Sequence, residues 1–397
     1  HIFRNMVDAI ITPISCNQTD YYIFDCQPDQ AITMEDIGFM QDQIGAMFSQ
    51  ERSYHIHHNT CHDGSSKQGR IELTFLPKED WRKKICEWSY RIVDHFRIDR
   101  EVVAISINLL DRYLYSQQAF KQTHIDSHSF QLAAVSALYL TMKVHAMDDG
   151  AMGKNESTIA RGRRKMRLSS MVELSRGQFT ADDICYMEGQ ILATLSWKVN
   201  PITTSNFVDS FLRLMPHHST VSVDCQSTYN LSLHVLLDLS RYVSELAVCD
   251  VMISCTYLPS KIAMACIFLS MDEFNLTAFP WTVRNEFQST LLKFYNSNSG
   301  NTPWNNDDDI EIYQLMEGLS LSFRPHILMN EVGDDHPLVM ARNCGLLKLR
   351  QCSGRISLHN NKLPRKRRLN DGHNSCLESK VYPMGDIHTD YMRIVSP

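Results

Sequence analysis

The hydrophobic positions of the chain are densest between Phe130 and Met142, a run of 13 residues in which nearly every side chain is apolar or small. No face of this segment is plainly polar, and a helix without a polar face must be enclosed by other helices. A helix that spans a bilayer needs roughly 20 such residues, so we expect protein rather than lipid around it. The run ends in Lys143, one turn beyond Tyr139 on the same face, which puts a permanent charge at the edge of a buried seam.

The same pattern recurs 129 residues downstream. Residues 134–142 match residues 263–271 in side-chain size, and the same offset aligns 111–114 with 240–243. Two helical segments that repeat in order at one offset indicate a duplicated helical unit. The copies differ at Lys143, which falls opposite an aspartate in the second copy. Whatever the lysine does therefore belongs to the first copy alone.

Amphipathic spacing predicts five helices in each copy, because apolar residues recur every three or four positions between segments rich in turn residues. In the first copy the apolar stripes of these helices lie at 81–96, 102–113, 129–143, 168–174 and 184–195. In the second copy the predicted helices lie at 206–215, 229–247, 258–271, 281–295 and 309–319. Thr180 with Asp183 forms a capping-box pattern at the start of the fifth helix.

These helices divide the chain into two repeats with an extension at each end. The predicted parts are an N-terminal extension at 1–77 with one short helix near 34–54, a first repeat at 78–200 that contains an inserted polar loop at 148–167, a second repeat at 201–322, and a mostly disordered tail at 323–397. The chain begins at His1 rather than methionine, so we expect that its natural N-terminus lies further upstream.

Composition narrows the possible partners. A formal net charge of -6 argues against a general nucleic-acid binder, which draws its affinity from a surplus of Lys and Arg. We therefore expect neither nucleic acid nor a membrane among the partners. The 12 cysteines include no CxxC pair, and Cys86, Cys185 and Cys266 lie within apolar helical runs. This usage is typical of a reducing compartment in which cysteine serves as a small hydrophobic residue.

Motifs for catalysis are missing from the sequence. It has no glycine-rich phosphate loop, no GxSxG nucleophile turn and no HExxH zinc motif, which argues against an enzyme and against a bound cofactor. The histidine-rich segment 55–62 could coordinate zinc and offers the one basis for an enzyme. It lacks a second half-site at conventional spacing, so we favour a solvated loop and expect no metal.

Two charged residues break the apolar pattern. Lys143 ends the central helix, and Glu188 lies on a helical seam with Ile184, Ile191 and Leu195. Taken alone, the lysine is explained by the helix dipole, which favours a cation at the C-terminal end. Taken alone, the glutamate is explained as a residue at the rim of the core. Functional ion pairs are less common than structural ones, so the residues by themselves favour these simpler explanations.

Five segments, taken together and in order, resemble the cyclin family. They lie at 81–88, 110–114, 132–143, 187–192 and 257–263, and the resemblance extends over about residues 34–320. It implies an all-α fold of two tandem five-helix cyclin boxes, preceded by a short helix and followed by the tail. The first box is identified with the first repeat and the second box with the second repeat.

The resemblance also implies a function for the two charged residues. In cyclins, the residues that match Lys143 and Glu188 form a charge pair that binds the backbone around helix C of a cyclin-dependent kinase. The chain is thereby expected to be a regulatory subunit, not an enzyme, that forms a heterodimer with a Ser/Thr protein kinase. It is expected to activate the kinase by positioning helix C in cell-cycle control.

A second implied site is a docking patch for substrate or inhibitor peptides. Its candidate residues are Trp81, Ile85, Trp88 and Gln131. Simple core packing of the apolar stripe is the alternative explanation. The charges of Lys84 and Arg91 depart from the family pattern at this patch, so its specificity is expected to differ from the usual one.

The basic residues of the tail resemble a nuclear import signal, with solvated charge as the alternative. They are Arg365, Lys366, Arg367 and Arg368, and they lead us to expect localisation in the nucleus and cytoplasm. The basic run at 161–167 is expected to be an exposed loop without a function.

Two other members of the same fold family remain possible. One is a transcription-type cyclin that partners a kinase of RNA polymerase. The other is a transcription factor with the cyclin fold that binds DNA or peptides. The absence of a cysteine-rich zinc ribbon ahead of the repeats argues against the DNA-binding type.

Overall fold

The computed structural model describes residues 34–56, 79–121, 126–145, 166–216, 223–298, 304–324 and 336–348. Across these residues the chain is helical apart from turns and one isolated bridge pair, so the predicted all-α class is confirmed. The histidine-rich segment beyond residue 56, the inserted loop up to residue 165 and the import candidate at 365–368 lie outside the described residues.

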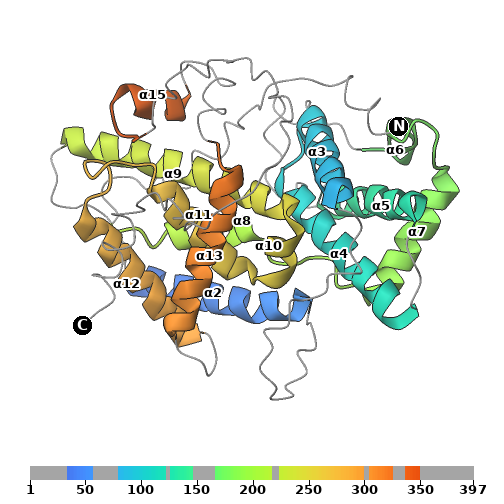
Figure 1. Ribbon diagram of the computed structural model, residues 1–397, viewed down its shortest axis with the longest axis horizontal. Helices are drawn as coiled ribbons and strands as arrows, with labels where there is room; N and C mark the ends of the chain where they lie inside the picture. The colour runs from blue at the N-terminus through green and yellow to red at the C-terminus, as the bar shows by residue number, and fades with distance from the viewer. Residues whose placement is uncertain are drawn as a thin grey trace, which may run out of the picture. The chain divides into compact units, whose positions relative to one another are not determined.

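The first repeat is built around the helix without a polar face. Its helices are α3 (Glu79–Phe96), α4 (Glu101–Lys121), α5 (Ser127–His145), α6 (Leu168–Leu174) and α7 (Ala181–Thr194) (Figure 1). Helix α5 packs against α4 and α7, and its Ala137 and Leu138 are completely buried. Protein therefore encloses this helix, as its sequence predicts.

The start of α7 is set by a local exchange of hydrogen bonds. The backbone N–H of Asp183 donates to the Thr180 hydroxyl at 3.2 Å, and the backbone N–H of Thr180 donates to the Asp183 carboxylate at 2.8 Å. Both bonds satisfy N–H groups that the beginning of a helix otherwise leaves without a partner. The predicted capping box is confirmed, and it fixes the face of α7 on which each later residue lies.

The second repeat has its own core around α11. Its helices are α8 (Thr204–Leu212), α9 (Val223–Cys249), α10 (Val251–Thr256), α11 (Pro259–Met271), α12 (Trp281–Asn298) and α13 (Asn306–Ser322). Helix α11 packs against α8, α9 and α13, and its Ala263 and Cys266 are completely buried. The position of α11 among its neighbours thus repeats that of α5, as the duplicated pattern indicates.

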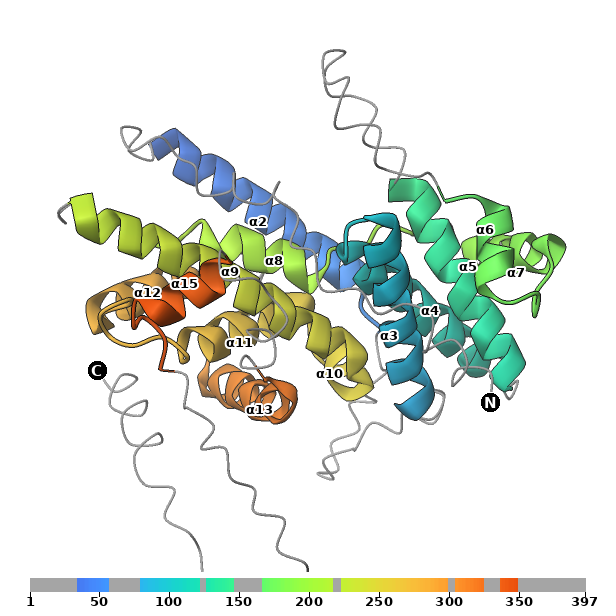
Figure 2. The ribbon, with the colours of Figure 1, turned by 90° about the horizontal axis from the view of Figure 1, so that it is seen from above.

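The helix of the N-terminal extension belongs to the core of the second repeat. Helix α2 (Met34–Tyr54) runs beside α8, as Figure 2 shows, and contacts α8, α11 and α12. Its Phe48 ring lies 5.5 Å from the ring of Phe207 and 5.4 Å from that of Tyr295, between ring centroids. The amphipathic pattern predicts this helix, but only the tertiary structure shows which core it completes.

One segment within the predicted tail at 323–397 is folded. Residues 336–348 are folded, with α15 (Pro337–Asn343) packed on α9 and with Leu338 and Ala341 buried in the second core. The backbone N–H of Asn275 donates to the carbonyl oxygen of Leu346 at 2.9 Å. A seven-residue helix is too short to show amphipathic periodicity, and contacts with residues distant in sequence hold this segment in place.

A further difference concerns the region between the second and third predicted helices of the second repeat. Helix α10 occupies Val251–Thr256, where the sequence pattern predicts no separate helix. The Asp250 side chain caps it by accepting a hydrogen bond from the backbone N–H of Ile253 at 3.0 Å. Six residues hold too few apolar positions to reveal a period.

Candidate functional site

The two charged residues that break the apolar pattern meet in space. Lys143 lies in the last turn of α5, and its Nζ donates a hydrogen bond to Oε1 of Glu188 on α7. The Lys143 side chain is 41% exposed and that of Glu188 is 10% exposed. The pair therefore lies at the rim of the first repeat, with the lysine open to solvent and the glutamate held against the core.

The packing of α7 explains the place of Glu188. Ile184 and Ile191 on the same seam are completely buried in the first core. Glu188 lies between them on this seam, and its carboxylate, only 10% exposed, accepts the hydrogen bond from Lys143 on α5. The Nζ of Lys143 also lies 5.5 Å from the ring centroid of Tyr139, one turn earlier, in a cation–π contact.

Three large apolar residues on or just after the two helices of this pair are exposed. Val144 follows Lys143 and is 38% exposed, Tyr186 on α7 is 70% exposed, and Trp197 just after α7 is 73% exposed. Sequence analysis does not single them out, because an apolar residue off the main stripe usually packs elsewhere in the core. The sequence does offer one sign of this exposed surface, Tyr186, which is an aromatic residue on the polar side of an otherwise clear amphipathic pattern.

The backbone after α7 holds Trp197 in a fixed place. Ser196 and Trp197 both adopt left-handed backbone angles, with φ of 51° and 61°, which residues other than glycine rarely do. The N–H of Trp197 donates to the carbonyl oxygen of Leu192 at 3.0 Å and so ends the helix. The exposed indole therefore lies just beyond the C-terminal end of α7.

The outer face of α7 carries a row of small residues. Cys185, Gly189 and Ala193 recur every four positions and are all exposed. A Cβ atom added at Gly189 would meet no other atom within 4 Å, so nothing in the described part of the chain covers this point. Small side chains allow the backbone of another protein to approach the helix closely.

The candidate docking residues on α3 and α5 have different environments. Ile85 is 2% exposed and belongs to the first core, as the core-packing alternative predicts for it. The ring of Trp81 lies 5.7 Å from that of Phe130, while Trp88 is partly buried against the same core. Gln131 is largely buried.

Gln131 is held by two hydrogen bonds. Its Nε2 donates to the Ser127 hydroxyl at 3.0 Å, and its Oε1 accepts from Nε2 of Gln178 at 2.9 Å. The amide is therefore fixed by partners on both sides. Any peptide that binds here must compete with these bonds or add to them.

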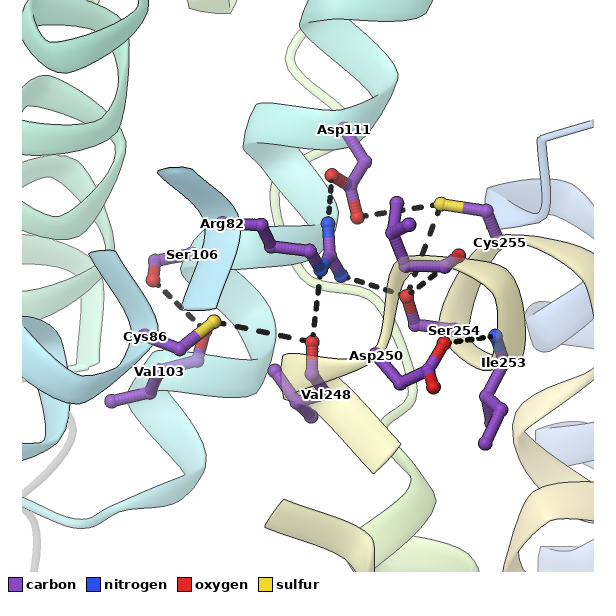
Figure 3. Close-up of polar contacts among 11 residues, drawn as sticks. Arg82, Cys86, Val103, Ser106, Asp111, Val248, Asp250, Ile253, Ser254 and Cys255 are labelled. Atoms are coloured by element: carbon purple, nitrogen blue, oxygen red, sulfur yellow. Dashed lines mark hydrogen bonds and ion pairs between the residues drawn. The ribbon is translucent and has the colours of Figure 1, made fainter. Parts of the chain in front are cut away.

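A buried ion pair connects the two repeats. Arg82 on α3 pairs with Asp111 on α4, and it also reaches into the second repeat (Figure 3). Its Nε donates to the carbonyl oxygen of Val248 at 3.1 Å, and its Nη2 donates to the Ser254 hydroxyl at 2.7 Å. Burial lowers the pKa of the guanidinium, but the Asp111 carboxylate together with Cys255 and Cys86 outweighs burial and holds the pKa above its usual range.

Both members of this pair lie within segments that carry the family resemblance, although the sequence does not reveal that they touch. Removal of either partner would leave a charge buried without compensation. We assign Arg82 and Asp111 a structural role, because neither side chain is exposed to a partner.

Other kinds of site find little support in the described residues. No group of three or more His, Cys, Asp or Glu residues among them could hold a metal ion. None of the helices described is long and apolar enough to cross a membrane. Residues 57–62 of the histidine-rich segment lie outside this part of the chain.

Comparison with known proteins places these features in a family. Residues 42–200 match the description "Cyclin, N-terminal domain", and residues 202–320 match "Cyclin, C-terminal domain". The chain is 24% identical over 214 residues to Cyclin-A1-4 of Oryza sativa subsp. japonica, a match that covers 54% of this chain and 49% of that protein. It is 27% identical over 193 residues to Cyclin-D3-2 of Arabidopsis thaliana, covering 48% of this chain and 44% of that protein.

The chain thus spans about half the length of these curated relatives. A solved viral cyclin from herpesvirus saimiri matches 62% of this chain and 87% of its own, at 16% identity and a TM-score of 0.40. That likeness is too weak to support a conclusion. Proteins with the two matched domains regulate kinases and are not catalysts, in agreement with the prediction that this chain is not an enzyme. Because both domains occur in tandem over most of an all-α chain, the protein belongs to the cyclin family.

Proposed function

We propose that this cyclin is the regulatory subunit of a cyclin-dependent Ser/Thr protein kinase, and that it binds the kinase through Lys143 and Glu188. The observation that carries the proposal is the ion pair itself. It joins two helices at the rim of the first repeat and leaves the lysine side chain 41% exposed. An ion pair with only a structural role would contribute little stability at such an exposed position, because solvent screens the attraction between its charges.

The pair offers both kinds of hydrogen-bonding group to another backbone. The Lys143 ammonium has three N–H donors, and the hydrogen bond to Glu188 uses one of them. The Glu188 carboxylate has acceptor sites beyond the one that Lys143 occupies. A peptide segment near helix C of a kinase presents carbonyl oxygens and N–H groups, which match this donor and acceptor.

The exposed apolar residues would supply most of the buried area. Tyr and Trp are enriched among the residues that dominate binding energy at interfaces, and Tyr186 and Trp197 are both widely exposed. Gly189 and its small neighbours on α7 leave room for a helix of the partner between them. The ion pair then fixes orientation, while the apolar surface provides affinity.

Kinase activation follows from selective binding. An active protein kinase needs the lysine of its third strand paired with the glutamate of helix C. A partner that binds only the inward position of helix C shifts the population towards the active state. The rigid enclosure of α5 suits this task, because a fixed surface can distinguish the two positions of the kinase helix.

The proposal also assigns roles to the two repeats, to the candidate docking residues and to the basic residues of the tail. We place kinase binding in the first repeat at 78–200 and assign the second repeat at 201–322 a supporting role. Trp81, Trp88 and Gln131 are proposed to receive docking peptides, with Ile85 supporting them from the core. Arg365, Lys366, Arg367 and Arg368 are proposed to direct nuclear import of a protein that also occurs in the cytoplasm.

The first experiment identifies the partner. The full chain is tagged, purified from cell lysate, and analysed by mass spectrometry and by a histone phosphorylation assay. We expect one or more cyclin-dependent kinases to be recovered together with kinase activity. A kinase that phosphorylates RNA polymerase in place of histone would favour the transcription-type alternative, and recovery of no kinase would contradict both.

The second experiment tests the site. In the double variant Lys143→Glu with Glu188→Ala, we expect affinity for the recovered kinase to fall about thirtyfold or more, the range of an interface hot spot. Lys293→Ala lowers the net charge by the same one unit at an exposed position on α12 and serves as the control. Unchanged affinity in a folded double variant would refute the assignment.

A further inference from the structure

Two cysteines meet where α3 of the first repeat contacts α9 of the second repeat. Cys86 on α3 is completely buried, whereas Cys249, the last residue of α9, is partly exposed. The Cys86 sulfur lies 4.0 Å from the carbonyl oxygen of Val248, a residue 162 positions away and adjacent to Cys249 (Figure 3). The single S–H of Cys86 can point to this carbonyl oxygen or to the sulfur of Cys249, with which it also has a hydrogen-bonding contact.

We propose that Cys86 and Cys249 form an oxidation site, in which hydrogen peroxide converts the two thiols to a disulfide that joins the first repeat to the second. The resting state is the reduced one seen in the structure, where both cysteines are free. In a reducing compartment such a disulfide forms transiently and is then reversed.

Three features separate this pair from a cysteine that only fills space. The two sulfur atoms are in hydrogen-bonding contact, one of the two residues is partly exposed, and a buried cation lies beside them. Cys266 has none of these features. It is completely buried in the second core, where burial raises the pKa of its thiol, as expected of a small hydrophobic residue.

The charges around the pair give the two thiols different roles. The hydrogen bond from Cys86 lowers the pKa of Cys249; burial opposes this effect, and the Arg82 charge reinforces it. The nearby Glu245 and Glu87 carboxylates act in the opposite direction, and the net pKa shift is downward. The same hydrogen bond, followed by burial, raises the pKa of Cys86.

Cys249 is therefore the thiol that meets the oxidant. It is the more exposed and the more readily ionised of the two, and the thiolate is the reactive form. Cys86, protected from solvent and already in contact with the Cys249 sulfur, is the thiol that completes the disulfide.

The reaction proceeds in two balanced steps. The Cys249 thiolate attacks one oxygen of hydrogen peroxide, a sulfur–oxygen bond forms, the oxygen–oxygen bond breaks, and the departing hydroxide takes up a proton to become water. The Cys86 thiol then attacks the Cys249 sulfur and loses its proton, and the sulfur–oxygen bond breaks to release a second water. The two thiols lose two electrons, and the peroxide gains them.

The disulfide would close a long loop of the chain, from Cys86 in the first repeat to Cys249 in the second. A cross-link stabilises a protein largely by limiting the freedom of its unfolded state, more so for a long loop. We expect the oxidised protein to unfold at a temperature higher by about 5 °C than the reduced protein. A thiol reductant should reverse this shift.

The test uses the full chain treated with hydrogen peroxide. Remaining thiols are blocked, and the protein is digested with trypsin without reduction and analysed by mass spectrometry. We expect peptide 85–91, which holds Cys86, to be linked to peptide 242–261, which holds both Cys249 and Cys255. Cys255→Ser should retain the link and Cys249→Ser should lose it, which identifies the partner of Cys86.

Unfolding temperatures give an independent readout. The exposed Cys344 provides a matched control, because Cys344→Ser should leave the peroxide-induced rise unchanged, whereas Cys86→Val should abolish it. Absence of the linked peptide from the oxidised natural chain would overturn the proposal, and so would a link that depends on Cys255. This outcome does not depend on kinase binding, so it can fail or succeed separately from the proposed function.

Discussion

The two repeats share a central helix but use charge at its end in opposite ways. In the first repeat, Lys143 lies in the last turn of α5 and is exposed to solvent beside Glu188. In the second repeat, the equivalent residue is Asp272, which follows α11 and lies 3.7 Å from the guanidinium of Arg284, a largely buried side chain of the same repeat.

The chain beyond each central helix extends this contrast. After α11, the folded segment at 336–348 covers the helix end, with the backbone N–H of Lys348 donating to the carbonyl oxygen of Glu273 at 2.6 Å. Lys261 on α11 likewise bonds within its own repeat, to Asp308 at 2.8 Å. The side chains of Lys143 and Asp272 are similarly exposed, at 41% and 40%, so the two copies differ in the sign of the charge at the helix end and in what packs beside it. This difference supports the placement of the kinase site in the first repeat alone.

The largest expected effect comes from the ion pair that joins the repeats. Arg82→Met should lower the free energy of unfolding by about 4 kcal/mol, because it leaves the Asp111 carboxylate buried without a partner. Urea unfolding monitored by circular dichroism measures this loss. In the double variant Arg82→Met with Asp111→Leu, most of the stability should return, since no charge remains buried. A double variant as unstable as the single one would show that the pair itself provides the stability.

The covering segment of the second repeat should come next. Leu338 is buried against α9, so Leu338→Ala should cost about 3 kcal/mol, the usual range for a buried leucine. Thermal unfolding measures the change. Met340→Ala on the same helix is the control, because Met340 is exposed and should matter little. Equal effects of the two substitutions would mean that α15 does not cover the second repeat as described.

The stability of the second core should also depend on pH, because Glu51 is buried in it. Glu51 on α2 is buried and accepts hydrogen bonds from the Ser260 backbone N–H at 3.0 Å and hydroxyl at 2.9 Å. Burial raises its pKa to about 7, and these hydrogen bonds only partly offset burial. The folded state therefore holds the proton more tightly than the unfolded state, so the stability from this group is greatest at low pH and is lost as the pH rises through about 7.

We expect the Glu51 carboxyl to account for a fall of about 2 to 3 kcal/mol in the free energy of unfolding between pH 5 and pH 8. Glu51→Gln keeps the shape without the charge, so it should flatten this part of the pH profile and be more stable than the natural chain at pH 8. Denaturant unfolding at both pH values tests the prediction. An unchanged slope in the variant would contradict it.

The smallest effect on stability is expected at the proposed kinase site. Lys143→Ala should change the free energy of unfolding by less than about 1 kcal/mol, because the lysine is well exposed, yet it should weaken kinase binding clearly. Lys261→Ala should instead lower the free energy of unfolding and leave kinase binding unchanged, because Lys261 is largely buried between Asp308 and Glu311. Calorimetric titration with the kinase and thermal unfolding of both variants measure the two quantities. If both variants changed stability and kinase binding in the same way, the proposed contrast between the repeats would be wrong.

Sequence patterns determined the features that depend on near neighbours in the chain. The apolar run of α5 predicts an enclosed helix, the Thr180 cap predicts the start of α7, and both agree with the structure. Lys143 and Glu188 could be selected because each carries a charge where its local pattern calls for an apolar or small residue. Such signals repeat every three or four residues, so a short stretch of sequence contains them completely.

Only the tertiary structure decided which distant residues meet. The contact of Arg82 with Val248 and Ser254, the assignment of α2 to the second core and the return of α15 onto α9 all join segments far apart in sequence. The same is true of the exposed surface around Trp197, since exposure depends on what fails to pack against a residue. A single sequence records the periodicity of each helix but not its neighbours, because many packings can bury the same apolar stripe.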